Sequence, residues 1–147
     1  MVEIVAITHD DGEILAPQWL PRAEAVHRQL RPDLPADYAR AMGEIFRDGA
    51  RMWIAVLDGE VAGLAVYRFV RNTHSGLKLY VDDLVTDSRV RSRGVGHALI
   101  AALERLARER QASSLDLDSG TQRHAAHRFY FREGFVITSF SFKKALS

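Results

Sequence analysis

The sequence predicts the α/β class of fold with a mixed sheet, arranged as one domain over residues 1–147. The length of 147 residues is that of a single domain. Short runs rich in β-branched and aromatic residues alternate with stretches whose apolar residues repeat at helical spacing. The expected order is β-α-α-β-β-β-α-β-α-β, in which an antiparallel run of strands leads into a strand–helix–strand crossover. A doubly wound parallel sheet is therefore not expected.

The composition excludes several classes of protein. Lys and Arg number 20 and Asp and Glu 19, a net charge of +1, whereas nucleic-acid binding draws on an excess of positive charge. There is no cysteine, which rules out disulfides, thiolate zinc sites and a cysteine nucleophile. No apolar run approaches roughly 18 residues, and no leader peptide opens the chain. We expect a cytoplasmic protein with neither a nucleic-acid nor a membrane partner.

The first part of the chain is expected to supply one strand and two helices. Val2–Thr8 is apolar and β-branched, as in a buried strand. Helical spacing predicts helices over Ile14–Leu30 and Ala36–Asp48, and the prolines of Arg31–Pro35 separate them. A common apolar side of the first helix is formed by Trp19, Leu20, Ala23, Val26, His27 and Leu30.

The second part is expected to build most of the sheet and its crossover. Asp58-Gly59 is a strong hairpin signal between two β-branched runs. Apolar residues from Val95 to Leu106 recur at helical spacing and predict the crossover helix. The expected strands are Arg51–Leu57, Val61–Val70, Leu77–Thr86, Ser114–Asp118 and Phe135–Lys144, and the last helix is Gln122–Glu133.

A strand, a glycine-containing turn and a helix start follow one another between Lys78 and Arg110, and this sequence of elements suits a phosphate group. The first N–H groups of a helix have no intrahelical partner, and the helix dipole makes that end partly positive. Gly94 and Gly96 let the backbone approach a ligand closely. Nearby arginines add guanidinium groups that match phosphate oxygens.

Two common phosphate motifs do not fit this turn. A P-loop needs Lys-Ser or Lys-Thr after its second glycine, and neither follows Gly96. The dinucleotide fingerprint needs a third glycine, where this chain has Leu99. What remains is Arg91–Gly96, which matches the pattern Arg/Gln-x-x-Gly-x-Gly/Ala. The alternative is a basic surface turn before a helix.

A second motif lies near the C-terminus. Arg123–Phe135 matches Asn-x-x-Ala-x-x-(apolar)-Tyr-x-x-x-Gly-Phe, except that Arg123 stands where asparagine is usual. The matching residues are Ala126, Phe129, Tyr130, Gly134 and Phe135. The two motifs, in this order, resemble the GCN5-related N-acetyltransferase (GNAT) family, and the resemblance covers most of the chain from Arg51 onward.

The resemblance implies that acetyl-CoA binds as co-substrate and that no metal is needed. The family splays two central parallel strands to admit the pantetheine arm, and its pyrophosphate lies on the loop before the central helix. The implied pantetheine positions are Leu84, Val85 and Thr86. The implied pyrophosphate positions are Arg91, Ser92, Arg93, Gly94, Val95 and Gly96, with His97 beside them.

The resemblance also implies catalytic roles. Tyr130 corresponds to a tyrosine that protonates the departing thiolate, and a phenol of pKa about 10 suits a thiol of about 8.5. The alternative for Tyr130 is a core aromatic residue beside Phe129. The backbone N–H of Val85 would stabilise the oxyanion. His124 and His127 are neighbours on one helix without a third ligand, so exposed helix histidines are favoured over zinc.

The base is left open among three carboxylates. Asp82 is placed first, because it matches an acidic pair seen in polyamine-type relatives, and Asp118 matches a position used by peptide N-terminal acetyltransferases. Adjacent carboxylates on a regular strand point to opposite faces, so at most one of Asp82 and Asp83 is expected in a given cleft. The alternative is that these groups bind a substrate ammonium or cap the turn at Ser119-Gly120.

The sequence therefore predicts an acetyl-CoA-dependent N-acetyltransferase whose acceptor is a primary amine of a small molecule or peptide. The amine would attack the acetyl group directly, and acidic residues near the site favour a cationic acceptor. Two alternatives stay open: an acyl-CoA sensor without catalysis, and a transferase for another acyl group or for a hydroxyl acceptor. The last strand is a candidate surface for a homodimer.

Overall fold

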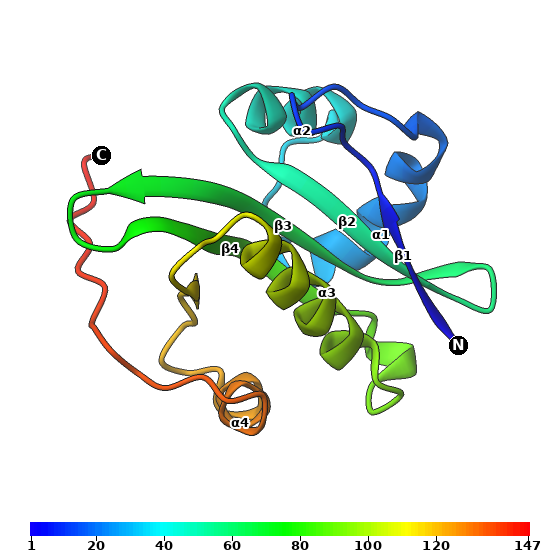
Figure 1. Ribbon diagram of the computed structural model, residues 1–147. Coiled ribbons are helices and arrows are strands. Elements are labelled where there is room, and N and C mark those ends of the chain that lie inside the picture. Colours follow the sequence, from blue (N-terminus) through cyan, green and yellow to red (C-terminus); the bar gives the residue numbers. More distant parts are fainter. The chain divides into compact units, whose positions relative to one another are not determined.

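The computed structural model describes every residue from Met1 to Ser147, and the chain divides into two compact units (Figure 1). Unit 1 is Met1–Asp116 and unit 2 is Leu117–Ser147. Unit 1 contains nearly all of the sheet and three α-helices, and unit 2 contains the last helix and the C-terminal segment. None of the helices combines the length and the hydropathy of a helix that crosses a membrane.

Five strands form one sheet in the order β1-β2-β3-β4-β5, and the first three pairs are antiparallel. The strands are β1 (Val2–Ala6), β2 (Arg51–Leu57), β3 (Glu60–Asn72), β4 (Gly76–Thr86) and β5 (Leu115–Leu117). Just before β5, Ser113 N–H donates to Leu77 O at 2.8 Å and Leu79 N–H donates to Ser114 O at 3.0 Å. Strands β4 and β5 therefore run parallel to each other. The predicted mixed α/β sheet is confirmed.

The helices follow the predicted order, but the first helix begins later in the sequence than predicted. They are α1 (Leu20–Leu30), α2 (Tyr38–Arg47), α3 (Val95–Glu109) and α4 (His124–Arg132), with short 3-10 turns at η1 (Pro17–Trp19) and η2 (Ser88–Val90). The helix predicted from Ile14 begins at Leu20 because Pro21 fits only a first turn. Asp37 caps α2 by accepting a hydrogen bond of 3.1 Å from Arg40 N–H.

Helices cover both faces of the sheet within unit 1 (Figure 1). Residues of α1 and α2, such as Val26 and Met42, share one buried cluster with Leu64 and Val66 of β3. Neighbouring residues on a strand face opposite ways, and Gly63 accordingly faces α3. A Cβ on Gly63 would lie 2.7 Å from Val95 Cγ1, so β3 and α3 approach closely at this glycine.

The final strand predicted over Phe135–Lys144 is not formed, and that prediction is wrong for this structure. These residues carry no strand pairing, and Val136, Phe140 and Phe142 are 75%, 83% and 94% exposed. The alternation of side chains marks a segment as suited to a strand, but a strand exists only where another strand satisfies its backbone groups. No such partner meets this segment within unit 2.

Candidate active site

A bulge in β4 places two adjacent carboxylates on the same side of the sheet. Val66 pairs with Asp83, but the next residue of β3, Tyr67, pairs with Val81, so Asp82 is an extra residue. A β-bulge interrupts the strict alternation of side chains and redirects them. Asp82 and Asp83 therefore both line one hollow. The expectation that only one of them could face a given cleft is wrong, because it assumed a regular strand.

This hollow, which we name the β4 hollow, has a volume of about 510 Å³ and lies entirely within unit 1. Its walls come from α1, the connection between α1 and α2, α2, β3 and β4. The charged residues that line it are Arg31, Asp33, Arg68, Asp82 and Asp83. Three carboxylates against two guanidinium groups give one net negative charge. Apolar side chains, among them Leu30, Met42 and Val66, complete the wall.

Asp82 is held by an arginine from the neighbouring strand. Arg68 Nε and Nη2 donate to the same oxygen, Asp82 Oδ2, at 2.9 and 2.5 Å. The side chains are 31% and 25% exposed for Arg68 and Asp82, so the pair is partly shielded from water. Since both bonds end on Oδ2, the other carboxylate oxygen is left for a ligand. Asp82 was the favoured candidate base from the sequence, and it lies at this hollow.

Asp83 is bound through both of its oxygens. Oδ1 accepts a hydrogen bond of 2.8 Å from Arg31 Nε, and Oδ2 lies 2.7 Å from His27 Nε2. Burial by itself raises the pKa of the Asp83 carboxyl, but the hydrogen bonds and charges of His27 and Arg31 outweigh it, and the net pKa is lowered. The Asp83 carboxylate therefore stays ionised near neutral pH and forms part of the wall of the hollow.

The loop before α3 has the conformation expected of an anion-binding turn. Gly94 is the N-cap of α3 in the left-handed region at φ 83°, and no acidic residue lies in the first helical turn. Residues 91–94 are exposed, whereas Val95 is buried and anchors the helix start. A Cβ built on Gly94 would meet no atom within 4 Å, so the space before the helix is open. The loop of Arg91–Gly96 thus leaves the N-terminus of α3 open to a ligand.

Asp87 anchors this loop to the rest of unit 1, and sequence reasoning missed it. Its carboxylate is 2% exposed and accepts hydrogen bonds from Arg89 N–H at 3.1 Å, from the Arg89 guanidinium, and from Gln29 Nε2 at 3.2 Å. Ser88 N–H in turn donates to Gln29 Oε1 at 3.0 Å. An Asp followed by a short turn is a local signal for such a cap, so the sequence did contain a clue.

The end of β4 has one paired edge and one edge that β5 hardly covers. Leu84, Val85 and Thr86 pair with β3 on one side. On the other side β5 has three residues against eleven in β4, so it can pair with only a short part of that strand. Leu84–Thr86 follow directly from Asp82 and Asp83 and lead into the loop of Asp87. The predicted pantetheine and pyrophosphate positions therefore adjoin the β4 hollow along one strand.

Unit 2 holds the remaining predicted site residues. Tyr130 is 8% exposed, and its ring contacts Phe129 and Phe135 at centroid distances of 5.5 and 5.7 Å. Burial raises the pKa of the Tyr130 hydroxyl, and Arg123 opposes that shift. Asp118 is exposed just after β5.

Both histidines of the predicted pair lie on α4, and they differ in exposure. His124 is exposed, and His127 Nε2 lies 2.8 Å from Gly120 O. Their rings are 6.1 Å apart. The bond to a backbone carbonyl gives His127 a structural partner. The expectation that both would be exposed helix-surface residues is therefore met only in part, because His127 is partly buried.

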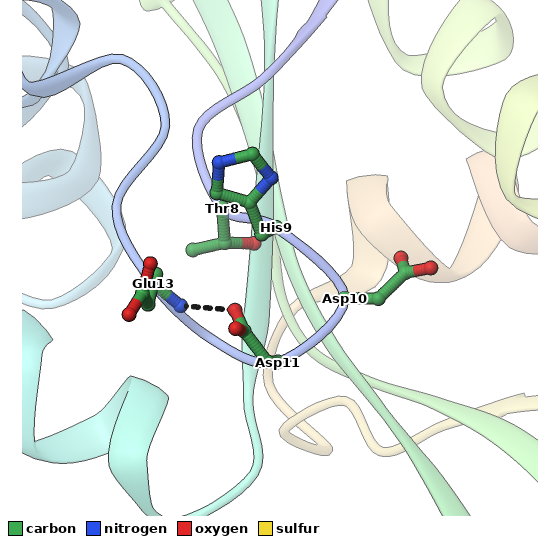
Figure 2. A pocket seen from close by; sticks show the side chains of 5 residues that line it. All are labelled: Thr8, His9, Asp10, Asp11 and Glu13. Carbon is green, nitrogen blue, oxygen red and sulfur yellow. Dashed lines mark hydrogen bonds between the residues drawn. The ribbon is translucent and has the colours of Figure 1, made fainter.

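A second hollow, of about 570 Å³, lies at the turn of residues 8–13 (Figure 2). Figure 2 shows the Asp11 carboxylate accepting the Glu13 N–H, at 2.9 Å, while Asp10 points away from the other side chains. Asp10 makes an ion pair with Arg110 at 3.0 Å, and Thr8 Oγ1 accepts from Met52 N–H at 3.2 Å. Asp11 is bonded within the turn, and Asp10 and Thr8 are bonded to other parts of unit 1, so we assign this turn a structural role.

The sequence matches the Acetyltransferase (GNAT) family over residues 13–135. The chain belongs to this family. It is 42% identical over 72 residues to the uncharacterized N-acetyltransferase YhdJ of Bacillus subtilis (strain 168), which covers 48% of this chain and 51% of the relative. It is 33% identical over 94 residues to the aminoalkylphosphonate N-acetyltransferase of Salmonella typhimurium (strain LT2), which covers 63% of this chain and 61% of the relative. The chain thus spans between half and two thirds of these curated relatives.

Solved structures agree with the GNAT fold. A structure described as a transcriptional regulator from Bacillus halodurans C-125 is 27% identical, with a TM-score of 0.75 over 99% of this chain and 100% of that chain. The aminoglycoside N-acetyltransferase AAC(6')-Iy, solved in complex with CoA, has a TM-score of 0.81 at 21% identity and covers 100% of this chain and 96% of its own. At that identity the likeness concerns the fold alone.

Proposed function

We propose that this GNAT protein is an acetyl-CoA-dependent N-acetyltransferase whose acceptor amine binds in the β4 hollow. The observation that carries the proposal is the continuity of one strand: Asp82 and Asp83 line the hollow, and β4 then runs into the open-fronted loop before α3. A carboxylate-lined cavity beside an anion-binding turn suits an ammonium acceptor and a phosphate-bearing donor.

The donor site would use the residues expected from the sequence. Arg91–Gly96, with His97 following, would hold the pyrophosphate through backbone N–H groups and the guanidinium groups of Arg91 and Arg93. The edge of β4 at Leu84–Thr86 would pair with the pantetheine amides. When bound, acetyl-CoA supplies an acyl group on a thiol leaving group. The chain itself supplies the binding surface, the orientation of the amine and the proton transfers.

Three side chains are proposed for proton transfer and amine binding. Asp82 keeps one oxygen free of Arg68 and is proposed to take the proton of the acceptor ammonium. Asp83, with both oxygens bound within the protein, is proposed to bind that ammonium rather than to titrate. Tyr130 is proposed to protonate the thiolate, because its raised pKa keeps the hydroxyl protonated and its motif position matches the family tyrosine. Asp118 stays a second candidate for the base.

The acceptor is proposed to be a small primary amine that also carries an anionic group. The β4 hollow contains Arg31 and Arg68 beside its carboxylates, so both ends of a zwitterion find an opposite charge there. The relative from Salmonella typhimurium is named for aminoalkylphosphonates, which are molecules of this class. Amines without an acid group would leave the guanidinium groups without that contact.

The first experiment is calorimetric titration with acetyl-CoA, beside the double variant Arg91→Glu/Gly94→Trp as a control. We expect micromolar binding by the wild type and none by the control. No binding by the wild type would leave Arg91–Gly96 a basic turn and would defeat the proposal. Acceptors are then compared in matched pairs, with 2-aminoethylphosphonate against n-propylamine. Competition among acyl-CoAs of different length tests the alternative of another acyl group.

A catalytically silent acyl-CoA sensor is the second candidate, because the same loop and strand would serve it. Tyr130→Phe separates the two. An enzyme loses most of its turnover in this variant and keeps its acetyl-CoA affinity, whereas a sensor has no turnover in either form. The Asp82→Asn and Asp118→Asn variants, assayed together, decide between the two candidate bases.

We also propose that the protein forms a homodimer through the segment of Phe135–Lys144. The exposed apolar side chains of this segment and its lack of strand pairing support that assignment.

A further inference from the structure

His27 is a buried polar side chain that the proposed reaction leaves without a role. It lies on α1, is 1% exposed, and shares the buried face of the helix with Leu20 and Val26. A polar ring at such a position is costly unless both nitrogens are hydrogen-bonded. Nδ1 lies 2.7 Å from the Tyr38 hydroxyl oxygen, and Nε2 lies 2.7 Å from Asp83 Oδ2.

The Asp83 partner requires a hydrogen on Nε2 of the His27 ring. The Asp83 carboxylate is ionised and can only accept, so His27 Nε2–H donates to it. Burial, followed by the charges of Glu24 and Asp83, raises the pKa of Tyr38, so its hydroxyl stays protonated and is hydrogen-bonded to His27 Nδ1. Two consecutive hydrogen bonds therefore join Tyr38, His27 and Asp83. This series of hydrogen bonds ends on the Asp83 carboxylate, in the wall of the β4 hollow.

This arrangement holds the Asp83 carboxylate on two sides. His27 binds Oδ2 from within α1, and Arg31, just after α1, binds Oδ1. A carboxylate bound at both oxygens cannot rotate about its terminal torsion, and the lone pairs that remain keep a fixed direction. The side chain of Asp83 is 13% exposed, so a ligand in the hollow can reach it.

We propose that His27 is a positioning residue of the acceptor site, which acts by orienting the Asp83 carboxylate that binds the acceptor ammonium. The inference rests on the proposed function, because it assigns the β4 hollow to an amine. Small errors in the position of a bound reactant are costly to a transfer reaction, and groups behind the binding residue commonly set that position. His27 borders the hollow but is only 1% exposed, so its effect passes through Asp83.

Substitution of His27 by glutamine or by asparagine provides a matched pair of variants with side-chain amides of different length. In His27→Gln the side-chain amide reaches about as far as imidazole Nε2 and can donate to Asp83. In His27→Asn it reaches only as far as Nδ1, so it can bond Tyr38 but not Asp83. His27→Leu keeps volume and removes both bonds. Steady-state kinetics with 2-aminoethylphosphonate as the varied acceptor, at saturating acetyl-CoA, should show KM raised about tenfold or more in the Asn and Leu variants. The Gln variant should stay close to the wild type, and calorimetric acetyl-CoA affinity should be equal in all four proteins.

Three outcomes would overturn the inference. One is an unchanged KM in His27→Leu. Another is equal loss in the Gln and Asn variants, with lowered melting temperatures and weakened acetyl-CoA binding, because that pattern marks a structural role. The third is measured if the wild type binds acetyl-CoA but turns over no acceptor. The 13C carboxyl resonance of Asp83 is then followed as 2-aminoethylphosphonate is added, and no shift in the wild type refutes the inference. A shift in the wild type and the Gln variant that is missing in the Asn variant supports it. Failure of acetyl-CoA binding, measured separately, counts against the proposed function instead.

Discussion

Asp87 links the charge of one side chain to the shape of the anion-binding loop. The hydrogen bond from the Arg89 side chain is the main cause that lowers the pKa of its carboxyl to about 2, although burial acts in the opposite direction. An unfolded Asp has a pKa of about 3.9. The carboxylate therefore stabilises the folded state fully above about pH 4, and this stabilisation disappears as the pH falls through about 2.

The first prediction is that Asp87→Asn lowers the free energy of unfolding at pH 7 by about 1 kcal/mol, because Arg89 is exposed and water screens the pair. The difference from the wild type should shrink as the pH falls to 2, where about half of the wild-type carboxyl is protonated. Urea unfolding at pH 7, 4 and 2 measures it. Asp58→Asn is the control at pH 7, since that exposed carboxylate lies 3.6 Å from Arg93 and should contribute little. A difference that persists unchanged at pH 2 would contradict the assignment.

Individual candidate site residues could be proposed from the sequence where a short motif contains them, and not where they come together only through tertiary structure. Arg91–Gly96 could be proposed because glycine and arginine before a helix are suited to binding a phosphate group. Asp82 could be named because a carboxylate inside a strand is unusual. His27 could not, since its helical spacing is that of an apolar residue, and its partner Asp83 lies 56 residues away. Only the folded chain brings those two together.

At the scale of elements, local signals predicted the sheet well and its irregularities poorly. Asp58 and Gly59 both have positive φ, 53° and 77°, as the hairpin between β2 and β3 requires. The bulge at Asp82 has no such signature, because it depends on how β4 meets β3. A strict alternation rule therefore assigned Asp82 and Asp83 to opposite faces.

The second prediction concerns the contact of β3 with α3. In Gly63→Ala the new Cβ would lie 2.7 Å from Val95 Cγ1 and 2.8 Å from Val85 O, and a backbone oxygen cannot move aside cheaply. We expect the free energy of unfolding to fall by roughly 1–3 kcal/mol. Thermal and urea unfolding measure this change. Because Val85 and Val95 both border the proposed donor site, acetyl-CoA affinity should also fall.

Gly43→Ala in α2 is the matched control with the opposite sign. Its Cβ would meet only Arg47 Nη1 at 3.6 Å, an ordinary contact with a side-chain end. Alanine is favoured over glycine inside a helix, so stability should rise by up to about 1 kcal/mol. If Gly63→Ala were as stable as the wild type, the close approach of strand and helix would not be a constraint on this fold.

At the scale of the whole molecule, the C-terminal segment shows that a sequence pattern can predict a strand that the structure does not form, because a strand also needs a partner strand. Phe135–Lys144 alternates as a strand does, yet unit 2 offers it no partner strand. Large exposed apolar side chains on a segment without strand pairing favour association with another chain. The sequence predicts the capacity to pair, and the identity of the partner is a property of the assembly.

The third prediction is that this segment is covered by a second copy of the chain in solution. Sedimentation velocity should show a dimer that dissociates on dilution, and backbone amides of residues 136–144 should gain protection from hydrogen exchange as the dimer forms. The triple variant Val136→Ser/Phe140→Ser/Phe142→Ser removes the apolar side chains that are 75–94% exposed and should shift the equilibrium toward the monomer. Its acetyl-CoA affinity should be retained, because the loop at Arg91–Gly96 lies in unit 1. A wild type that stays monomeric at every concentration, with residues 136–144 unprotected, would show that the segment has no partner strand in another chain.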